Sequence, residues 1–185
     1  MPSGDSLIKL KYMDIQIRPE TVADRQAIYR LIELAFGQNN ESRLVDLFRK
    51  DDCFIPELSL VAHMNEEIIG HIIFTKIVIR GETGRETSSL ALAPMGVLPA
   101  HQKSGIGGKL IRAGLSAAKE LGHQSVIVMG HKDYYPKFGF LPAEKWEIST
   151  HYEVPSEYFM AIELIPGALS NAKGVVEYSA PFSQL

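Results

Sequence analysis

The sequence predicts an α/β fold: a mixed, mostly antiparallel central sheet that contains one parallel pair of strands and carries helices on both faces. Three observations support this prediction. A short strand is followed by two segments with apolar residues at helical spacing. Long β-branched runs joined by short turns indicate antiparallel hairpins. A strand–helix–strand unit at residues 89–129 indicates a parallel pair, because parallel strands need a long crossover between them.

The N-terminal half begins with a strand at 15–18, where polar and apolar residues alternate. Thr21 is placed to cap the helix that follows, with Asp24 three residues later near the positive end of the helix dipole. One face of this helix carries the apolar residues Ile28, Leu31, Ile32, Ala35 and Phe36. A second helix is expected at 41–50. Three strands are expected next, at 58–63, 68–79 and 89–97, with turns at 65–67 and 81–84 between them.

The C-terminal half continues the third of these strands into a helix. Pro94 interrupts the strand, and because proline lacks an N–H donor it indicates a β-bulge or an edge. The helix at 106–121 has the clearest amphipathic pattern, and Gly122 suits the left-handed residue after its end. Further expected elements are a strand at 125–129, one helical turn at 134–138, and two final strands at 140–148 and 158–164.

The length of 185 residues suits one domain, which we place at 13–165, with a flexible lead-in at 1–12 and a C-terminal extension at 166–185 that packs on the domain. A net charge of -3 argues against a nucleic-acid partner. Without a signal peptide or a long apolar span, we expect a cytoplasmic protein with no membrane partner. Cys53 is the only cysteine, and we expect a core or surface residue rather than a nucleophile.

The most informative segment, 97–108, joins the third strand to the amphipathic helix and places glycines where the chain turns. Ser104 is placed to cap this helix, whose free backbone N–H groups can bind an anion such as a phosphate. The segment is not a P-loop, because the chain has Lys103 and Leu110 where that motif needs a glycine and a hydroxyl. The dinucleotide-binding pattern fails as well, since it needs a third glycine at 110.

The pattern Val-x-Pro-x-x-Gln-x-x-Gly-x-Gly, from Val97 to Gly107, resembles the acyl-CoA loop of the GNAT N-acetyltransferase superfamily. The resemblance covers about residues 14–165 and is strongest at 94–142. It implies the GNAT fold, acetyl-CoA as cosubstrate and no metal. It also implies a bulge that separates two parallel strands, main-chain contacts of the first of these strands to the pantetheine arm, and a pyrophosphate cradle of backbone N–H groups. The cofactor-binding residues that it implies are Met95, Gly96, Val97, Gln102, Lys103, Ser104, Gly105, Ile106, Gly107, Gly108 and Tyr135.

The segment 134–140, Tyr-Tyr-Pro-Lys-Phe-Gly-Phe, is similar to the family sequence Tyr-x-Lys/Arg-x-Gly-Phe, with Tyr135 in the tyrosine position. When an amine attacks a thioester, a thiolate leaves, and a tyrosine hydroxyl near the sulfur can donate a hydrogen bond or a proton to it. The resemblance therefore implies that Tyr135 is catalytic, while Tyr134 points elsewhere. Together with Gly130 and His131, this segment also resembles the YhbS-like branch of predicted N-acetyltransferases.

The general base is less evident from the sequence. Many members of the superfamily carry a carboxylate on the strand before the loop, but residues 90–97 contain no acid. The candidates are Glu41, because the family's acceptor site lies under the first helix–loop–helix, and His131, because it follows a strand end and histidine as a residue type suits proton removal near neutral pH. His101 is a poorer candidate, since we expect it to face solvent at the loop entrance.

We therefore expect an N-acetyltransferase that moves an acetyl group from acetyl-CoA to a primary amine by direct attack in a ternary complex. The acceptor stays open among a small metabolite, an antibiotic, a polyamine, and a peptide or protein amine, and a homodimer is allowed. Residues 36–47 and 145–158 are expected to select the acceptor. Two alternatives remain open: a CoA-binding regulatory or interaction module without turnover, which the missing strand carboxylate favours, and a transferase of a longer acyl group.

Overall fold

The computed structural model describes residues 15–184, so the predicted lead-in at 1–12 lies outside the described part of the chain. The strands are β1 (Gln16–Pro19), β2 (Phe54–Met64), β3 (Glu67–Arg80), β4 (Glu86–Val97), β5 (Ser125–Met129), β6 (Leu141–Pro142), β7 (Ile148–Ser149), β8 (Phe159–Glu163) and β9 (Gly174–Glu177). The α-helices are α2 (Arg25–Phe36), α3 (Asn40–Phe48) and α4 (Ile106–Glu120). Short 3₁₀ turns include η1 (Val22–Asp24), η3 (Tyr135–Phe138), η4 (Ala143–Trp146) and η6 (Ala180–Ser183).

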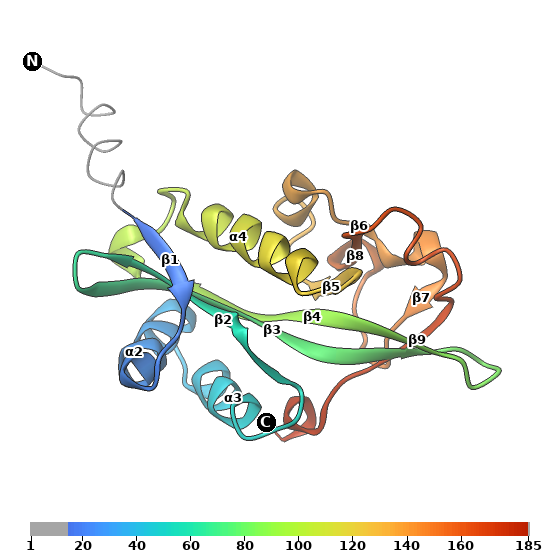
Figure 1. Cartoon of the computed structure of the whole chain (residues 1–185), viewed down its shortest axis with the longest axis horizontal. Coiled ribbons are helices and arrows are strands. Elements are labelled where there is room, and N and C mark those ends of the chain that lie inside the picture. Colours follow the sequence, from blue (N-terminus) through green and yellow to red (C-terminus); the bar gives the residue numbers. More distant parts are fainter. Residues whose placement is uncertain (1–14, 185) are drawn as a thin grey trace, which may run out of the picture.

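All the described strands belong to one sheet, in the order β1-β2-β3-β4-β5-β8-β6, with β9 beside β3 and β7 beside β9 (Figure 1). Parallel pairing joins β4 to β5 and β7 to β9, and the other described pairs are antiparallel. The predicted mixed, mostly antiparallel sheet with a parallel pair is confirmed. The crossover between β4 and β5 is α4, as the strand–helix–strand pattern indicates.

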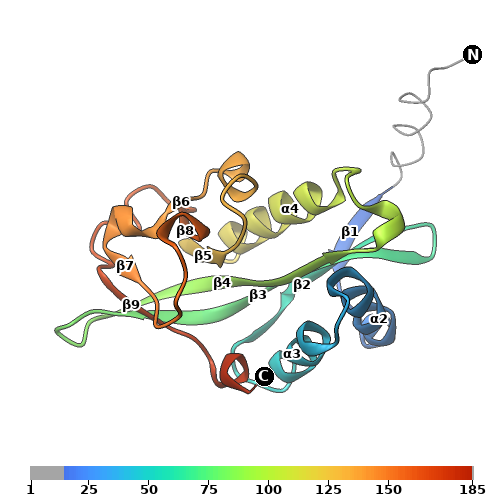
Figure 2. The same cartoon turned by 180° about the vertical axis from the view of Figure 1, so that it is seen from behind.

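Helices cover both faces of the sheet: α2 and α3 lie on one face and α4 on the other (Figures 1 and 2). The chain enters the first helical segment through a capping interaction, in which the Thr21 N–H donates to Asp24 Oδ2 at 2.7 Å. The α2–α3 face packs around a core of Ile28, Leu31, Ile32, Val45, Phe48, Cys53, Val61, Ile73 and Ala93. The thiol of Cys53 lies inside this core, and burial raises its pKa to about 11, as suits a structural cysteine.

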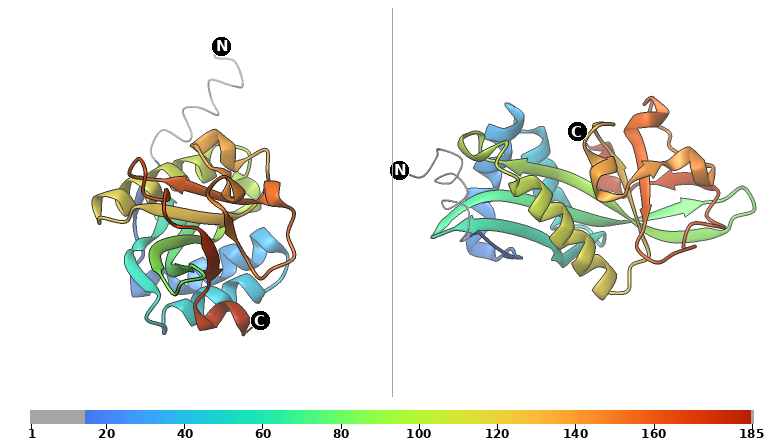
Figure 3. Two further views of the ribbon diagram at one scale, coloured as in Figure 1. Left: turned by 90° about the vertical axis from the view of Figure 1, so that its right-hand side faces the viewer. Right: turned by 90° about the horizontal axis from the view of Figure 1, so that it is seen from above.

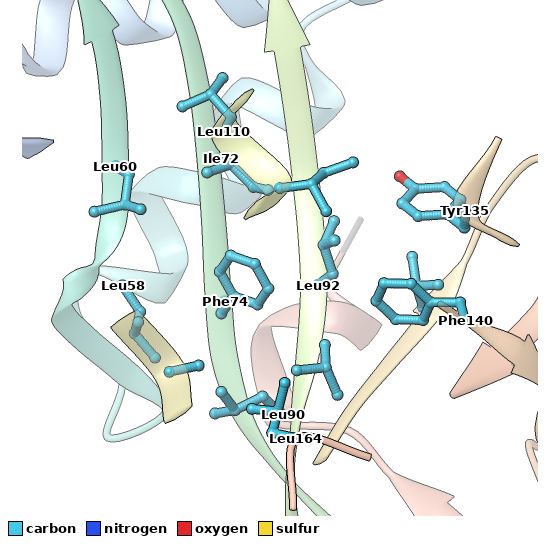
Figure 4. Close-up of a cluster of buried hydrophobic side chains, with 14 of the residues drawn as sticks. Leu58, Leu60, Ile72, Phe74, Leu90, Leu92, Leu110, Tyr135, Phe140 and Leu164 are labelled. Atoms are coloured by element: carbon cyan, nitrogen blue, oxygen red, sulfur yellow. The ribbon is translucent and has the colours of Figure 1, made fainter. Parts of the chain in front are cut away.

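The opposite face is covered by α4, which crosses the strands obliquely (Figure 3, right). Its buried residues Leu110 and Ile111 meet the side chains of Ile72, Phe74 and Leu92 in the largest core cluster (Figure 4). Gly114 sets the distance between helix and sheet. A Cβ at this position would lie 2.2 Å from Cε2 of the buried Phe74, so only glycine permits this approach.

Strand β4 contains the bulge that Pro94 predicts. Ile72 pairs with Met95 and Phe74 pairs with Leu92, so two residues of β4, at positions 93 and 94, lie opposite one residue of β3. A bulge of this kind bends its strand and increases the local twist. Because β4 also borders β5, the bend directs the end of β4 away from its parallel neighbour.

The predicted strand at 140–148 is wrong. The chain makes only the two-residue strands β6 and β7 there, separated by η4. Glu147, the residue that ends η4, has a φ of 55°, in the left-handed region, and turns the chain from η4 into β7. The predicted C-terminal extension at 166–185 contains β9, which pairs with β3 and carries the chain back along the sheet to α3 (Figure 2).

A buried ion pair joins the end of β1 to α3. Arg49 donates to both carboxylate oxygens of Glu20, at 2.7 and 2.9 Å, and Ser59 donates to Glu20 Oε2 at 2.6 Å. Burial alone would raise the pKa of Glu20, but hydrogen bonds from His71, Arg49 and Ser59 outweigh it and hold the pKa at about 2. The carboxylate is therefore ionised over the physiological range and fixes α3 against the sheet.

Candidate active site

The parallel strands β4 and β5 pair over only two residues each. Leu90 pairs with Val126 and Ala91 with Ile127, and beyond these positions the strands separate. A cavity of about 420 Å³ lies beside the gap. Its lining residues are Phe36, Glu41, Leu44, Ala91, Leu92, Ala93, Pro94, Met95, Ile127, Met129, Tyr135, Tyr178 and Phe182. The cavity thus opens at the β4 bulge and extends toward α3 and the C-terminal segment.

The end of β4 offers main-chain hydrogen-bonding groups to this gap. The Leu98 N–H donates to the Ile69 carbonyl on β3, and Gly96 lies opposite His71 in the register. Because the bonding direction alternates along a strand, the main-chain groups of Met95 and Val97 face away from β3, toward the gap. The side chain of Gln102 donates to the Val97 carbonyl at 3.1 Å and joins the loop to the strand end.

The glycine-rich loop ends in a left-handed turn at the start of α4. Gly105 is the N-cap residue with a φ of 87°, and nothing lies within 4 Å of a Cβ built on it. The first N–H groups of the helix, from Ile106 to Gly108, have no carbonyl partner one turn earlier within the helix, and the helix dipole adds positive potential there. The geometry suits an anion held by backbone donors.

Two sequence expectations about this loop are corrected by the structure. Ser104 does not cap α4, because its hydroxyl donates instead to the carbonyl of His101. His101 does not face solvent: it is 7% exposed, and its Nε2 lies 3.9 Å from a carboxylate oxygen of Glu67. The 3₁₀ turn at Pro99–His101 directs the imidazole of His101 into the protein. No motif in the sequence indicates this burial.

Cationic side chains surround the first turn of α4. The guanidinium of Arg112 lies 5.1 Å from the centre of the Phe138 ring, and its Nη1 would be 3.1 Å from a Cβ on Gly108. Lys137 lies 5.8 Å from the centre of the Tyr134 ring. These two charges add to the positive end of the helix, so the loop region favours a ligand with several negative charges.

The adjacent tyrosines point in different directions, as the sequence suggests. A Cβ built on Gly107 would lie 2.8 Å from the Tyr134 hydroxyl oxygen, which places that hydroxyl over the first turn of α4. The two rings stand nearly perpendicular, at 83°, with centres 5.4 Å apart. Tyr135 turns instead into the cavity, and its hydroxyl points toward β4 (Figure 4).

The position of Tyr135 depends on Gly130 at the end of β5. A Cβ there would lie only 2.0 Å from Cε2 of the Tyr135 ring. The ring also packs against Phe140, with centres 5.7 Å apart. Burial, and then the neighbouring Tyr134, raise the pKa of Tyr135 to about 12, so its phenol keeps its proton at neutral pH. Among the described residues, this hydroxyl has no hydrogen-bond partner, which leaves it available to a ligand.

The structure separates the two candidates for the base. Glu41 lies in the first turn of α3 and lines the same cavity as Tyr135. Gln38 donates to both of its carboxylate oxygens, at 3.0 and 3.2 Å, and orients them. The His131 side chain is 65% exposed, lies beside Asp133 and Tyr158, and does not line the cavity. Glu41 and Tyr135 therefore line the same cavity, whereas His131 lies outside it.

Sequence reasoning missed part of the cavity wall. Tyr178 and Phe182 line it from the C-terminal segment, although no motif marks them. Within the expected selective region 36–47, the residues Phe36, Glu41 and Leu44 line the cavity, whereas no described residue of 145–158 does. In the sequence of this segment, the only indication of such a role is that Tyr178 and Phe182 are aromatic and four positions apart.

Two further observations concern residues 15–184 only. No group of three or more histidine, cysteine, aspartate or glutamate side chains in this range is arranged to hold a metal ion. Over the same residues, every helix is too short or too polar to cross a lipid bilayer.

Comparison with known proteins identifies the family. Residues 16–143 match the family described as the acetyltransferase (GNAT) domain. The chain is 36% identical over 137 residues to the uncharacterized N-acetyltransferase YjhQ of Escherichia coli K12, covering 74% of this chain and 75% of that protein.

Solved structures agree with this match. The GNAT family N-acetyltransferase YhbS of Escherichia coli, solved in complex with CoA, has a TM-score of 0.86 and 26% identity over 93% of each chain. A GNAT family acetyltransferase of Brucella melitensis, solved with acetyl-CoA, has a TM-score of 0.74 and 32% identity over 91% of this chain and 97% of that one. The glycine-rich loop, the bulged β4 and the diverging parallel strands are thus those of a protein that belongs to the GNAT family of acetyltransferases.

Proposed function

We propose that this protein is an N-acetyltransferase that transfers an acetyl group from acetyl-CoA to a primary amine by direct attack in a ternary complex. The observation that carries the proposal is the cavity beside the gap between β4 and β5, in which the phenol of Tyr135 and the carboxylate of Glu41 line one space. A proton donor and a proton acceptor in a common cavity are what aminolysis of a thioester requires.

Acetyl-CoA would bind along the gap with its phosphates at the start of α4. The N–H groups at 105–108 would hold the pyrophosphate, as helix N-termini do. The main-chain groups of Met95 and Val97 would bind the pantetheine arm, since they face the gap, whereas Gly96 between them pairs with His71 on β3 and would only keep the strand close to α2. Gln102, Lys103 and Ser104 would shape the loop entrance. The complexes of YhbS with CoA and of the Brucella acetyltransferase with acetyl-CoA support acetyl-CoA as the ligand of this fold.

In the reaction, the amine nitrogen attacks the carbonyl carbon of the thioester and the carbon–sulfur bond breaks. Glu41 accepts the proton that the amine must lose, directly or through a water molecule, and Tyr135 donates its proton to the departing sulfur. The free thiol and the amide are the products, and Tyr135 regains its proton from solvent. Its raised pKa keeps the phenol protonated at neutral pH, so its hydroxyl can donate a hydrogen bond to the sulfur as negative charge develops there.

The test is amine-dependent release of the CoA thiol. We expect acetyl-CoA with a suitable amine to yield free thiol, and acetyl-CoA without an amine to yield almost none. Tight acetyl-CoA binding in calorimetry with no thiol release from any member of a broad amine panel would favour the binding module without turnover. A rate that rises from acetyl-CoA to butyryl-CoA would favour the transferase of a longer acyl group.

A further inference from the structure

The acceptor side of the cavity has a distinctive composition. The wall facing α3 and the C-terminal segment consists of Phe36, Leu44, Tyr178 and Phe182 around the single carboxylate of Glu41. We infer that the acceptor is a small primary amine with one positive charge and one apolar or aromatic group, an inference that rests on the proposed transferase function. The wall offers no second carboxylate to the further ammonium groups of a polyamine or an aminoglycoside.

Tertiary contacts hold the aromatic part of the wall in place. The ring of Phe182 lies 4.8 Å from that of Phe48 on α3 and 4.8 Å from that of Tyr178. The ring of Tyr178 in turn packs against that of Tyr152, with ring centres 5.4 Å apart. This row of rings docks the C-terminal segment against α3, so the wall is a packed surface with little freedom to rearrange around a polar ligand.

The charges of the cavity suit one ammonium group. Among its described lining residues, Glu41 is the only carboxylate, and there is no lysine, arginine or histidine. A primary amine enters as a cation and pairs with Glu41, which takes the first proton and leaves the neutral nucleophile. The second proton, released when the carbon–nitrogen bond forms, replaces through water the one that Tyr135 gives to the sulfur. A second ammonium on the same molecule would lose its water without gaining a second carboxylate, and attraction to the aromatic faces offsets only part of that cost.

The hydrophobic rim indicates where the rest of the amine lies. Phe36 is 42% exposed and Met129 is 38% exposed, although both are large apolar residues. Both line the cavity at its solvent-exposed edge, and the interior is also apolar. An apolar group on the ligand would therefore be shielded from water from the edge of the cavity to its interior. The favoured acceptor is therefore an arylalkylamine or a branched alkylamine, with its amine at Glu41 and its apolar group against Phe36 and Phe182.

The experiment compares kcat/KM for 2-phenylethylamine, ethylamine, putrescine and an Ala-Phe dipeptide, using release of the CoA thiol. We expect 2-phenylethylamine to exceed putrescine and the dipeptide at least about tenfold, because pocket contacts of this size discriminate by that amount. Phe182→Ala should lower kcat/KM for 2-phenylethylamine about tenfold more than it lowers kcat/KM for ethylamine.

A gain of function makes the test stricter. Phe36→Asp adds a second carboxylate at the exposed rim and should shift the preference from 2-phenylethylamine toward putrescine. Leu34→Asp is the matched control, since Leu34 is 60% exposed on the same helix and does not line the cavity; its preference should equal that of the wild type.

The outcomes separate the two proposals. Thiol release with putrescine or the dipeptide as the best substrate would overturn this inference while the transferase function stands. An unchanged preference in Phe36→Asp would also overturn it, provided that circular dichroism shows the variant folded. Absence of thiol release with every amine would overturn the transferase function and this inference with it.

Discussion

Replacing Tyr135 with phenylalanine removes one oxygen atom from the cavity and leaves the ring in place. The ring would keep its contacts with Phe140 and with the backbone at Gly130. Because the hydroxyl has no hydrogen-bond partner among the described residues, the free energy of unfolding should change by less than about 1 kcal/mol. The substitution therefore tests the chemistry of the hydroxyl with little effect on the fold.

The loss of rate follows from the proton that the phenol supplies. A single positioned acid contributes at least about a hundredfold, which is about 2.7 kcal/mol of the activation barrier. Both kcat and kcat/KM should fall by this factor, while the affinity for acetyl-CoA stays the same. Since the pKa of Tyr135 is about 12, the wild type should not lose this contribution as the pH rises through 10, where an ordinary tyrosine ionises.

The assay is steady-state thiol release together with calorimetry of acetyl-CoA binding. Tyr134→Phe is the matched control: its hydroxyl faces the first turn of α4, so the effect on kcat should be milder. Turnover of Tyr135→Phe at the wild-type rate, or a loss that appears only in acetyl-CoA affinity, would refute the assigned role.

Four further predictions follow from the same structure. Glu41→Gln should lower kcat/KM near neutral pH, with partial recovery at high pH where the amine loses its proton unaided; a pH–rate profile equal to that of the wild type would contradict this. Gly107→Glu should weaken acetyl-CoA binding more than tenfold in calorimetry, because a negative side chain would occupy the place of the phosphates. Gly114→Ala should destabilise the fold by roughly 1–3 kcal/mol in urea unfolding, since the added Cβ meets the ring of Phe74. The folded pKa of Glu20 is about 2, below its ordinary value of 4.5. Its contribution to the free energy of unfolding, roughly 3 kcal/mol at most, should therefore be complete above pH 4.5 and be lost as the pH falls toward 2. Measuring the free energy of unfolding across this acid range checks the prediction.

Local chemistry made much of the fold predictable. Pro94 indicated the bulge because a proline has no N–H for the ladder, and the register of β3 and β4 confirms it. The glycine at 122 indicated the end of α4 and indeed has a φ of 88°. In such places one residue type restricts the backbone strongly enough for the sequence alone to be informative.

Elements that depend on distant partners were harder to predict. Strand propensity in 140–148 is confined to its ends, and η4 separates them into two short strands that pair with different partners, Leu141 with Ala161 and Ile148 with Gly174. Strand β9 is four residues long and exists because β3 extends beyond β2 and offers an unpaired edge. Neither feature has a local pattern that single-sequence reasoning can detect.

The candidate site divides in the same way. The loop at 97–108 and the Tyr135 segment carry motifs, because the proposed phosphate binding and thiolate departure would need particular residues at fixed spacing. The acceptor wall needs only apolar bulk, so Tyr178 and Phe182 have no fixed spacing to Glu41 in the sequence. The inward position of His101 likewise follows from packing of the loop entrance and not from its neighbours in the chain.

The most direct test of the account is to incubate the wild type and Tyr135→Phe with acetyl-CoA and 2-phenylethylamine, and to measure free thiol and the mass of the amine together. The account predicts that the wild type releases one thiol for each amine that gains an acetyl group, and that Tyr135→Phe does so about a hundredfold more slowly. Thiol release without an acetylated amine, or equal rates for the two proteins, would contradict it.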